Sequence, residues 1–188
     1  MNINTSFLGC FPKLKKRPKP PTAIVIHHTC TKTPERTRKV LKDQGYSTHY
    51  EIDRDGTVYQ YADPMEIACH VGSANVHAIG VDITHVSHGE FTEAQYGSYI
   101  ELMDMLCDRY GIKKEVHEVL EGIWPHGALG NTECPQGFEI RRYVGAIEGV
   151  DFDVVRRVCE LIGVAIVDGR RDELVAAIHA HFPRILTQ

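Results

Sequence analysis

Long apolar runs are missing from this sequence of 188 residues, and cysteines are few. No stretch reaches 18 consecutive apolar residues, which excludes a membrane-spanning helix of ordinary length. Six cysteines are too sparse in a chain of this size to indicate a disulfide-stapled fold. A recognisable signal peptide is also missing, although "FLGC" loosely resembles a lipoprotein cleavage site ending at Cys10. We therefore expect a chain that is made in the cytoplasm and has no transmembrane segment.

Acidic residues are absent from the first twenty positions, which hold five basic residues. These are Lys13, Lys15, Lys16, Arg17 and Lys19. The rest of the chain carries 16 basic against 25 acidic residues, and we expect no nucleic-acid partner. One interpretation of residues 1–21 is a basic, proline-rich N-terminal arm that favours an anionic partner such as a cell-envelope polymer. The other is a solvated, disordered leader.

The hydrophobic pattern predicts an α/β fold in one domain of ordinary size. A hydrophobic content of 43% and a charged content of 24% are typical of a globular protein with a core. Asp55-Gly56, between two strand-like runs, is a strong hairpin signal. The predicted strands are 22–28, the two arms of the hairpin, and 78–86; the predicted helices are 33–45 and 91–112. We expect a mixed central β-sheet flanked by helices.

After residue 146 the pattern changes to two short amphipathic segments around "VDGR". Each has apolar residues at helical spacing, which indicates a small C-terminal helical appendage. We therefore divide the chain into the arm (1–21), a central domain (22–146) and a helical module (147–188).

The stretch "HGALGNTECP" places His126 and Cys134 on a loop that is poor in apolar residues. Two imidazoles and one thiolate would leave the fourth tetrahedral position of a zinc ion open, as in catalytic sites. His27 or His28, at the end of the first strand, could supply the second imidazole. Asp82, on the non-core face of its strand, is a candidate proton acceptor. Spacing alone fits structural histidines and an inert thiol as well.

Five blocks in order give the chain a family resemblance. "IVIHHT", "THYEIDRDGTVYQY", "ACHVGSANVHAIGVDI", "FTEAQY" and "HGALGNTECP" resemble type 2 N-acetylmuramoyl-L-alanine amidases, a group that includes peptidoglycan recognition proteins and phage lysozyme-like amidases. The resemblance covers about residues 22–140. It implies the amidase fold for the central domain and a zinc ion bound by His27, His126 and Cys134.

The same resemblance implies roles for four further residues. Asp82 takes the place of the catalytic acid, and Thr132 is a supplementary donor to the developing oxyanion, with support of the loop as its alternative role. His70 would line the substrate cleft, and Tyr50 would contact substrate unless it packs in the core. The chain departs from the usual family pattern at Thr48, Asp82, Gly127 and Thr132, but no zinc ligand is lost.

The implied reaction is hydrolysis of the amide between N-acetylmuramic acid and L-alanine in bacterial peptidoglycan, on the cell wall or on cytoplasmic wall fragments. A phage endolysin is one such enzyme. The resemblance also allows a recognition protein that binds peptidoglycan without cleaving it, and a zinc amidase acting on another amide. The C-terminal segment weakly resembles small helical peptidoglycan-binding modules, and a plain helical cap is the alternative.

Overall fold

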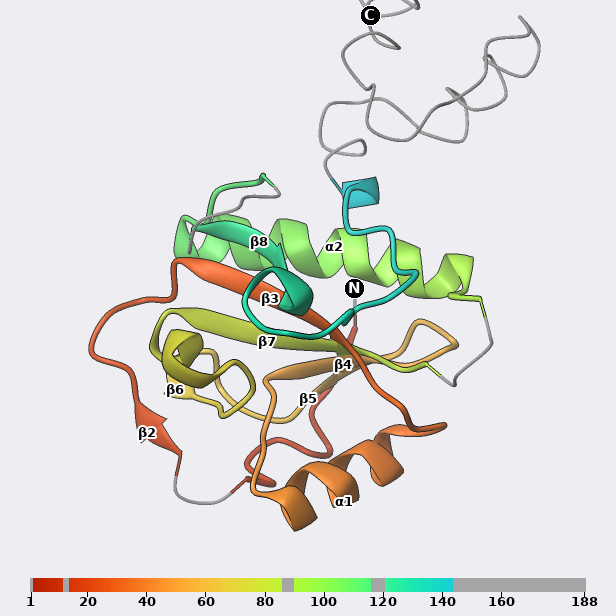
Figure 1. Cartoon of the computed structure of the whole chain (residues 1–188), viewed down its shortest axis with the longest axis horizontal. Coiled ribbons are helices and arrows are strands. Elements are labelled where there is room, and N and C mark those ends of the chain that lie inside the picture. The colour runs from red at the N-terminus through yellow and green to blue at the C-terminus, as the bar shows by residue number, and fades with distance from the viewer. Residues whose placement is uncertain (1, 12–13, 86–89, 116–120, 144–188) are drawn as a thin grey trace, which may run out of the picture. The chain divides into compact units, whose positions relative to one another are not determined.

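The fold is built around a six-stranded mixed sheet in our computed structural model, which describes residues 2–11, 14–85, 90–115 and 121–143 (Figure 1). The strand order is β1-β5-β4-β7-β3-β8. All neighbouring pairs are parallel except the antiparallel β4–β5 hairpin. The strands are β1 (Ile3–Asn4), β3 (Ala23–His28), β4 (Tyr50–Ile52), β5 (Val58–Gln60), β7 (Ala78–Ile83) and β8 (Gly122–Pro125). The predicted mixed sheet flanked by helices is confirmed.

Shorter elements complete the described part of the chain. β2 (Lys15–Lys16) and β6 (Glu66–Ile67) form a separate antiparallel pair. Two 3-10 helices, η1 (Gly72–Val76) and η2 (His126–Ala128), lie in the connections. The β4–β5 hairpin turns at the predicted Asp55-Gly56, where Gly56 adopts a positive φ of 86°. A side chain at this position would be strained, which explains the glycine.

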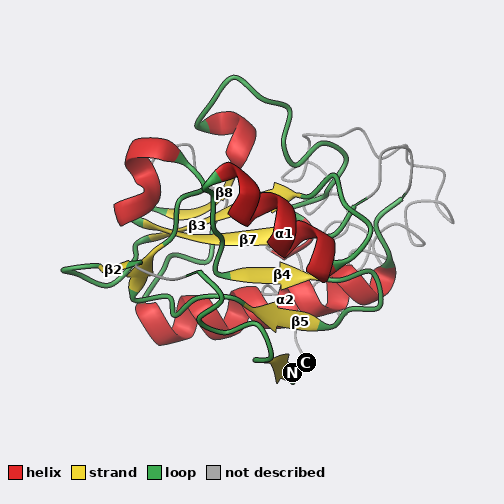
Figure 2. Ribbon diagram, turned by 90° about the horizontal axis from the view of Figure 1, so that it is seen from below, coloured by secondary structure: helices red, strands yellow, loops and turns green. Residues whose placement is uncertain are grey.

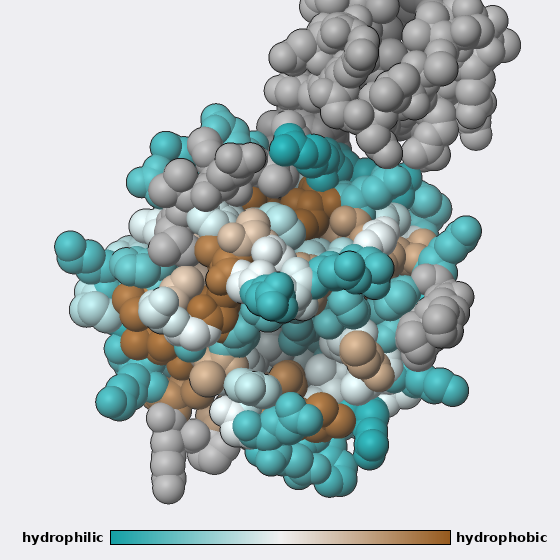
Figure 3. All heavy atoms as spheres, viewed as in Figure 1, coloured by the Kyte–Doolittle hydropathy of each residue, from teal (hydrophilic) through white to brown (hydrophobic). Residues whose placement is uncertain are grey.

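Helix α1 (Pro34–Gln44) has the predicted ends. The Thr33 side chain accepts a hydrogen bond from the Arg36 N–H, and Gly45 ends the helix in the left-handed conformation. Figure 3 shows hydrophilic residues over α1, whereas the Thr37 hydroxyl points inward and bonds Glu51 on β4. Helix α1 therefore covers the face of the sheet on which Glu51 lies.

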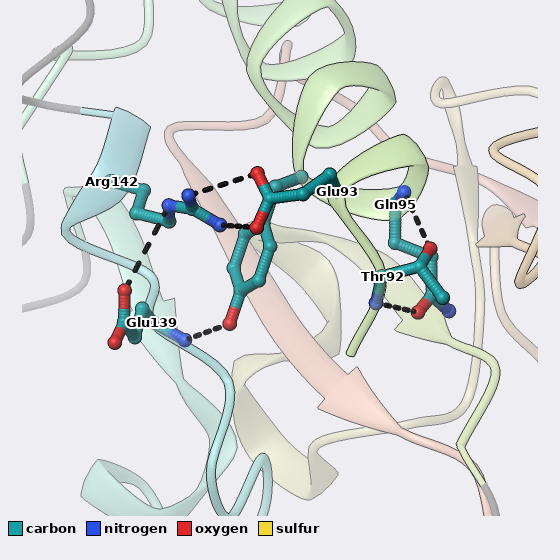
Figure 4. A network of polar contacts seen from close by, with 6 residues as sticks. Thr92, Glu93, Gln95, Glu139 and Arg142 are labelled. Carbon is teal, nitrogen blue, oxygen red and sulfur yellow. Dashed lines mark hydrogen bonds and ion pairs between the residues drawn. The ribbon is translucent and has the colours of Figure 1, made fainter. Parts of the chain in front are cut away.

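Helix α2 (Glu93–Tyr110) packs on the opposite face of the sheet (Figure 2). Its start is fixed by a capping box between Thr92 and Gln95 (Figure 4). The helix and the sheet share the main hydrophobic core, to which α2 contributes the fully buried Tyr99, Leu102, Met103 and Leu106. These four residues recur at helical spacing in the sequence, which places them on one side of α2.

Residues 139–143 pack against the start of α2 through hydrogen bonds, an ion pair and a cation–π contact. The Arg142 guanidinium donates two hydrogen bonds to the Glu93 carboxylate, at 3.0 and 3.1 Å, and stacks over the Tyr96 ring (Figure 4). The Glu139 N–H donates to the Tyr96 hydroxyl at 3.1 Å. This attachment stabilises the segment that follows the "HGALGNTECP" loop.

The N-terminal residues are part of the fold, and their interpretation as a solvated, disordered leader is wrong for the described ones. β1 extends the sheet by pairing with β5, and β2 pairs with β6. Arg17 is only 4% exposed because its guanidinium donates to the backbone oxygens of Glu66, Val76 and Ala78. A buried side chain with three backbone partners gives this segment a fixed place.

The predicted C-terminal helical module (147–188) lies outside the described residues. The chain divides by its contacts into Met1–Ile147 and Glu148–Gln188, near the boundary that the sequence pattern predicts. The roles assigned to the three segments stay predictions. Within the part that the structure describes, no helix is long and apolar enough to cross a membrane.

Candidate metal centre

His27 lies on the face of the sheet opposite α2. Alternate residues of β3 point to opposite faces, and Ile24 and Ile26 belong to the core under α2. His27 therefore shares the other face with Val25. It is 6% exposed, and burial, followed by the nearby His126 and His28, lowers its pKa to about 3. A neutral imidazole is the form that binds a metal ion.

The "HGALGNTECP" loop folds back on itself. The Gly127 N–H donates to the Cys134 carbonyl at 2.6 Å, which joins the two ends of the loop. A Cβ atom at position 127 would lie 2.5 Å from the Thr132 carbonyl oxygen, so only glycine fits there. The His28 N–H donates to the Cys134 Sγ at 3.3 Å and ties the thiol to the end of β3. The sequence flagged Gly127 as a departure from the family pattern, and this contact supplies its physical reason.

The structure brings His27, His126 and Cys134 together. One ligand atom from each lies within 4.8 Å of the others, and the His27 and His126 rings are 4.5 Å apart between centroids. The set of two imidazole nitrogens and one sulfur suits zinc and leaves one tetrahedral position for water or substrate. Burial raises the pKa of Cys134 to about 11, so a metal ion must displace the thiol proton. The three residues fit a zinc ion.

His70 supports His27 from the neighbouring loop. Its Nδ1 lies 3.0 Å from the His27 Nε2, within hydrogen-bond distance. Because that contact occupies Nε2, the Nδ1 of His27 is left for a metal ion. The His70 ring packs on Gly80 of β7, where a Cβ atom would come within 2.9 Å of it. His70 therefore contacts a ligand candidate directly, beside any role in the substrate cleft.

Asp82 lies beside His27 on the same face of the sheet. The two are register partners on the parallel strands β7 and β3. Asp82 is 8% exposed, and burial, followed by the neighbouring Glu51, raises its pKa to about 8. A hydrogen bond from the Thr48 side chain opposes that rise. Thr48, a departure from the family pattern, thus contacts the candidate proton acceptor.

Thr132 and Tyr50 are placed differently from the cluster residues. The exposed Thr132 accepts a hydrogen bond from the Cys134 N–H at 3.2 Å, as expected for support of the loop. Tyr50 is 2% exposed and packs in the core under α2, on the face opposite His27. Its alternation along β4 puts it on the wrong face to reach a substrate at the histidine cluster. The prediction that Tyr50 contacts substrate there is wrong.

Sequence reasoning missed Glu51 and His49. Both are fully buried on the α1 side of β4. His49 accepts from the Gly80 N–H through Nδ1 at 2.9 Å, and its Nε2 lies 3.0 Å from the Glu66 carbonyl. The alternation "HYEI" was the available signal, because its apolar Tyr50 and Ile52 face the core and place both polar residues on the opposite side.

Comparison with known proteins gives the family. The family model described as N-acetylmuramoyl-L-alanine amidase matches residues 17–137. The chain belongs to this amidase family. The family resemblance predicted from the five sequence blocks is thereby confirmed. A Rickettsia conorii protein assigned by name to these amidases is 30% identical in an alignment of 99 residues, which covers 48% of this chain and 37% of that protein. The chain thus aligns with about a third of that relative's length.

Solved structures share the fold of this amidase-family chain. The N-acetylmuramoyl-L-alanine amidase LysC from Clostridium intestinale is 24% identical, with a TM-score of 0.63 over 80% of this chain and 99% of that one. The Ph2119 endolysin from a Thermus scotoductus bacteriophage is 22% identical, with a TM-score of 0.62 over 76% and 98%. Drosophila peptidoglycan recognition protein SA is 16% identical, with a TM-score of 0.55 over 71% and 85%. At these identities the likeness shows the fold alone.

Proposed function

We propose that the chain is a zinc-dependent N-acetylmuramoyl-L-alanine amidase that cleaves the amide between N-acetylmuramic acid and L-alanine in bacterial peptidoglycan. The observation that carries this proposal is the convergence of His27, His126 and Cys134, with ligand atoms within 4.8 Å, beside the carboxyl group of Asp82. Membership of the amidase family supports the substrate and the bond cleaved.

His27, His126 and Cys134 would hold the zinc ion. Zinc at such a site acts as a Lewis acid that polarises a carbonyl and lowers the pKa of water. His70 fixes the orientation of the His27 ring through the 3.0 Å contact between their ring nitrogens. The His28 N–H does the same for the Cys134 sulfur.

Asp82 would move the protons of the reaction. It accepts a proton from the attacking water and returns one to the leaving L-alanine amine. A carboxyl group whose pKa, raised by burial to about 8, lies near neutral pH suits both steps. Its place next to His27 puts it at the edge of the candidate metal centre.

Thr132 would help to stabilise the oxyanion that forms at the amide carbonyl. Its hydroxyl oxygen already accepts from the Cys134 N–H, and this hydrogen bond leaves the hydroxyl proton to be donated outward. The side chain is exposed and lies two residues from the cysteine ligand. We propose His70 as the residue that lines the substrate cleft.

The test is mass spectrometry of soluble products after incubation of purified peptidoglycan with the protein. Stem peptides with an L-alanine amino terminus are expected from the zinc-loaded chain and not after chelation or from Cys134→Ala. The matched control is Cys10→Ala, which removes another half-buried thiol and is expected to keep activity. Wall binding without release of peptides from the zinc-loaded chain would instead indicate a peptidoglycan recognition protein.

We further propose a cell-wall-degrading role of the endolysin kind. Its support is that endolysins are among the proteins of the same fold. Lysis of bacteria by the zinc-loaded protein added from outside is the expected result. Activity confined to small soluble wall fragments would indicate a recycling enzyme.

A further inference from the structure

Glu51 is a buried acid held by three hydroxyl groups from three different parts of the chain. Its side chain is 0% exposed. Oε1 accepts from the hydroxyls of Thr37 on α1, at 2.8 Å, and Thr84 after β7, at 2.7 Å. Oε2 accepts from the Tyr61 hydroxyl after β5 at 2.5 Å. Hydrogen bonds donated to a carboxylate favour its charged form, so these contacts suit a buried negative charge.

The strand register places this charge near the candidate metal centre. His27 on β3, Asp82 on β7 and Glu51 on β4 are successive register partners across three parallel strands. All three lie on the α1 side of the sheet. Neighbouring strands are about 4.8 Å apart, so the Glu51 backbone lies about 10 Å from that of His27.

No basic side chain takes part in the hydrogen bonds that the structure shows for Glu51 among the described residues. The titratable groups that face it are the hydroxyls of Tyr61 and Tyr59 and the carboxyl groups of Asp53 and Asp82. Burial raises the pKa of Glu51, and the three hydroxyls oppose that rise. Within this network, hydroxyl hydrogen bonds and not a lysine or arginine stabilise the carboxylate form of Glu51.

We propose that Glu51 is a positioning residue whose buried negative charge strengthens metal binding by His27, His126 and Cys134. The proposal rests on the metal centre of the proposed function. A buried negative charge two strands from His27 attracts a divalent ion held there, and the burial of Glu51 keeps solvent and salt away from its carboxylate. At a separation of about 10 Å and an effective dielectric constant of about 20, the attraction between two unit charges corresponds to roughly a tenfold change in affinity.

The test measures zinc affinity by competition with a chromophoric chelator, using the full chain and zinc alone. Glu51→Gln keeps the shape and removes the charge, and we expect zinc binding about tenfold weaker. Glu51→Asp keeps the charge and is expected to stay within about threefold of the wild type. The control Glu35→Gln makes the same change at an exposed position on α1 and should leave zinc affinity unchanged.

Unchanged zinc affinity in a folded Glu51→Gln chain would overturn the proposal. So would equal losses in Glu51→Gln and Glu51→Asp, because packing and not charge would then be responsible. If Glu51→Gln does not fold, Tyr61→Phe replaces it. Removing one hydrogen-bond donor lowers the charged fraction of Glu51, so zinc binding to Tyr61→Phe should be weaker than to the wild type. Unchanged zinc affinity in this variant would contradict the proposed effect of the Glu51 charge. A wild type that binds zinc but releases no stem peptides refutes the amidase and leaves this inference standing, whereas one that binds no zinc refutes both.

Discussion

At the scale of single residues, backbone contacts decide whether the candidate ligands can meet. Gly127 brings its N–H within 2.6 Å of the Cys134 carbonyl, an approach that leaves no space for a side chain. Gly80 likewise makes space for the His70 ring, which contacts His27. Two glycines that bear no chemistry themselves therefore set the geometry of the cluster.

Gly127→Ala is expected to weaken zinc binding at least tenfold without unfolding the chain. The added Cβ would lie 2.5 Å from the Thr132 carbonyl oxygen, so the loop must open, at a cost of about 1–3 kcal/mol. Chelator competition measures the affinity, and circular dichroism checks the fold. Gly130→Ala is the control, because a Cβ there meets nothing nearer than 3.8 Å. Equal affinity in both variants would contradict the role of Gly127.

The buried His49 should make the metal-free protein less stable in acid. Burial, the largest cause, lowers its pKa from 6.5 to about 4, so below pH 6.5 the unfolded chain takes up the proton first. Stability from this group is complete above pH 6.5 and falls by about 3 kcal/mol as the pH drops to 4. Urea unfolding measured across this range should show a shallower pH dependence for His49→Gln. The exposed His77→Gln is the control, and an unchanged slope for His49→Gln would refute the assignment.

At the scale of elements, the basic N-terminal segment bonds to residues that lie far from it in sequence. Strand β2 pairs with β6, and Arg17 next to it bonds three carbonyls between residues 66 and 78. Those residues include η1 and the start of β7, the strand that carries Asp82. The segment therefore stabilises the face that holds the candidate site.

Arg17→Met should lower the free energy of unfolding by about 2–4 kcal/mol, because three backbone oxygens lose a charged donor. Methionine keeps most of the apolar length, so the loss reports the hydrogen bonds. Urea denaturation measures it. Lys16→Met, on the exposed neighbouring residue, is expected to stay within about 0.5 kcal/mol of the wild type. Similar losses in both variants would mean that the Arg17 contacts do not carry the effect.

At the scale of the whole molecule, one sheet separates a packing face from a chemical face. Helix α2 and the main core lie on one side (Figure 2). The other side carries His27, Asp82, His49 and Glu51, with α1 over the end near Glu51. This division lets polar and titratable groups gather without interrupting the core.

A chain ending at Ile147 should keep its zinc affinity within about twofold, because every candidate ligand lies within residues 1–147. Hydrolysis of a soluble muramoyl peptide should also persist. If residues 148–188 bind the wall, co-sedimentation with intact peptidoglycan should fall, as tethering is lost. Loss of zinc binding in the shortened chain would show that the division at this point is wrong.

The sequence by itself determined most of the fold and the identity of the cluster residues. The apolar run at 22–28, the strand pattern of 78–86, the turn at Asp55-Gly56 and the limits of both helices are local signals. The structure follows them because they reflect local backbone preferences. The strand β8 was missed, because "GIWP" is short and ends in proline. His27, His126 and Cys134 were identified because the order of five blocks matched a family, which spacing alone could not have shown.

Only the tertiary structure decided which side chains share a face and what surrounds them. Tyr50 lies in the core, while Glu51, next to it, joins the row of His27 and Asp82 because β4 pairs with β7 in that register. Arg17 was expected in a solvated segment. It is buried instead, and its guanidinium donates to carbonyls some 50 residues or more away in sequence. Such partners are set by strand order and register, which depend on long-range pairing that no local pattern encodes.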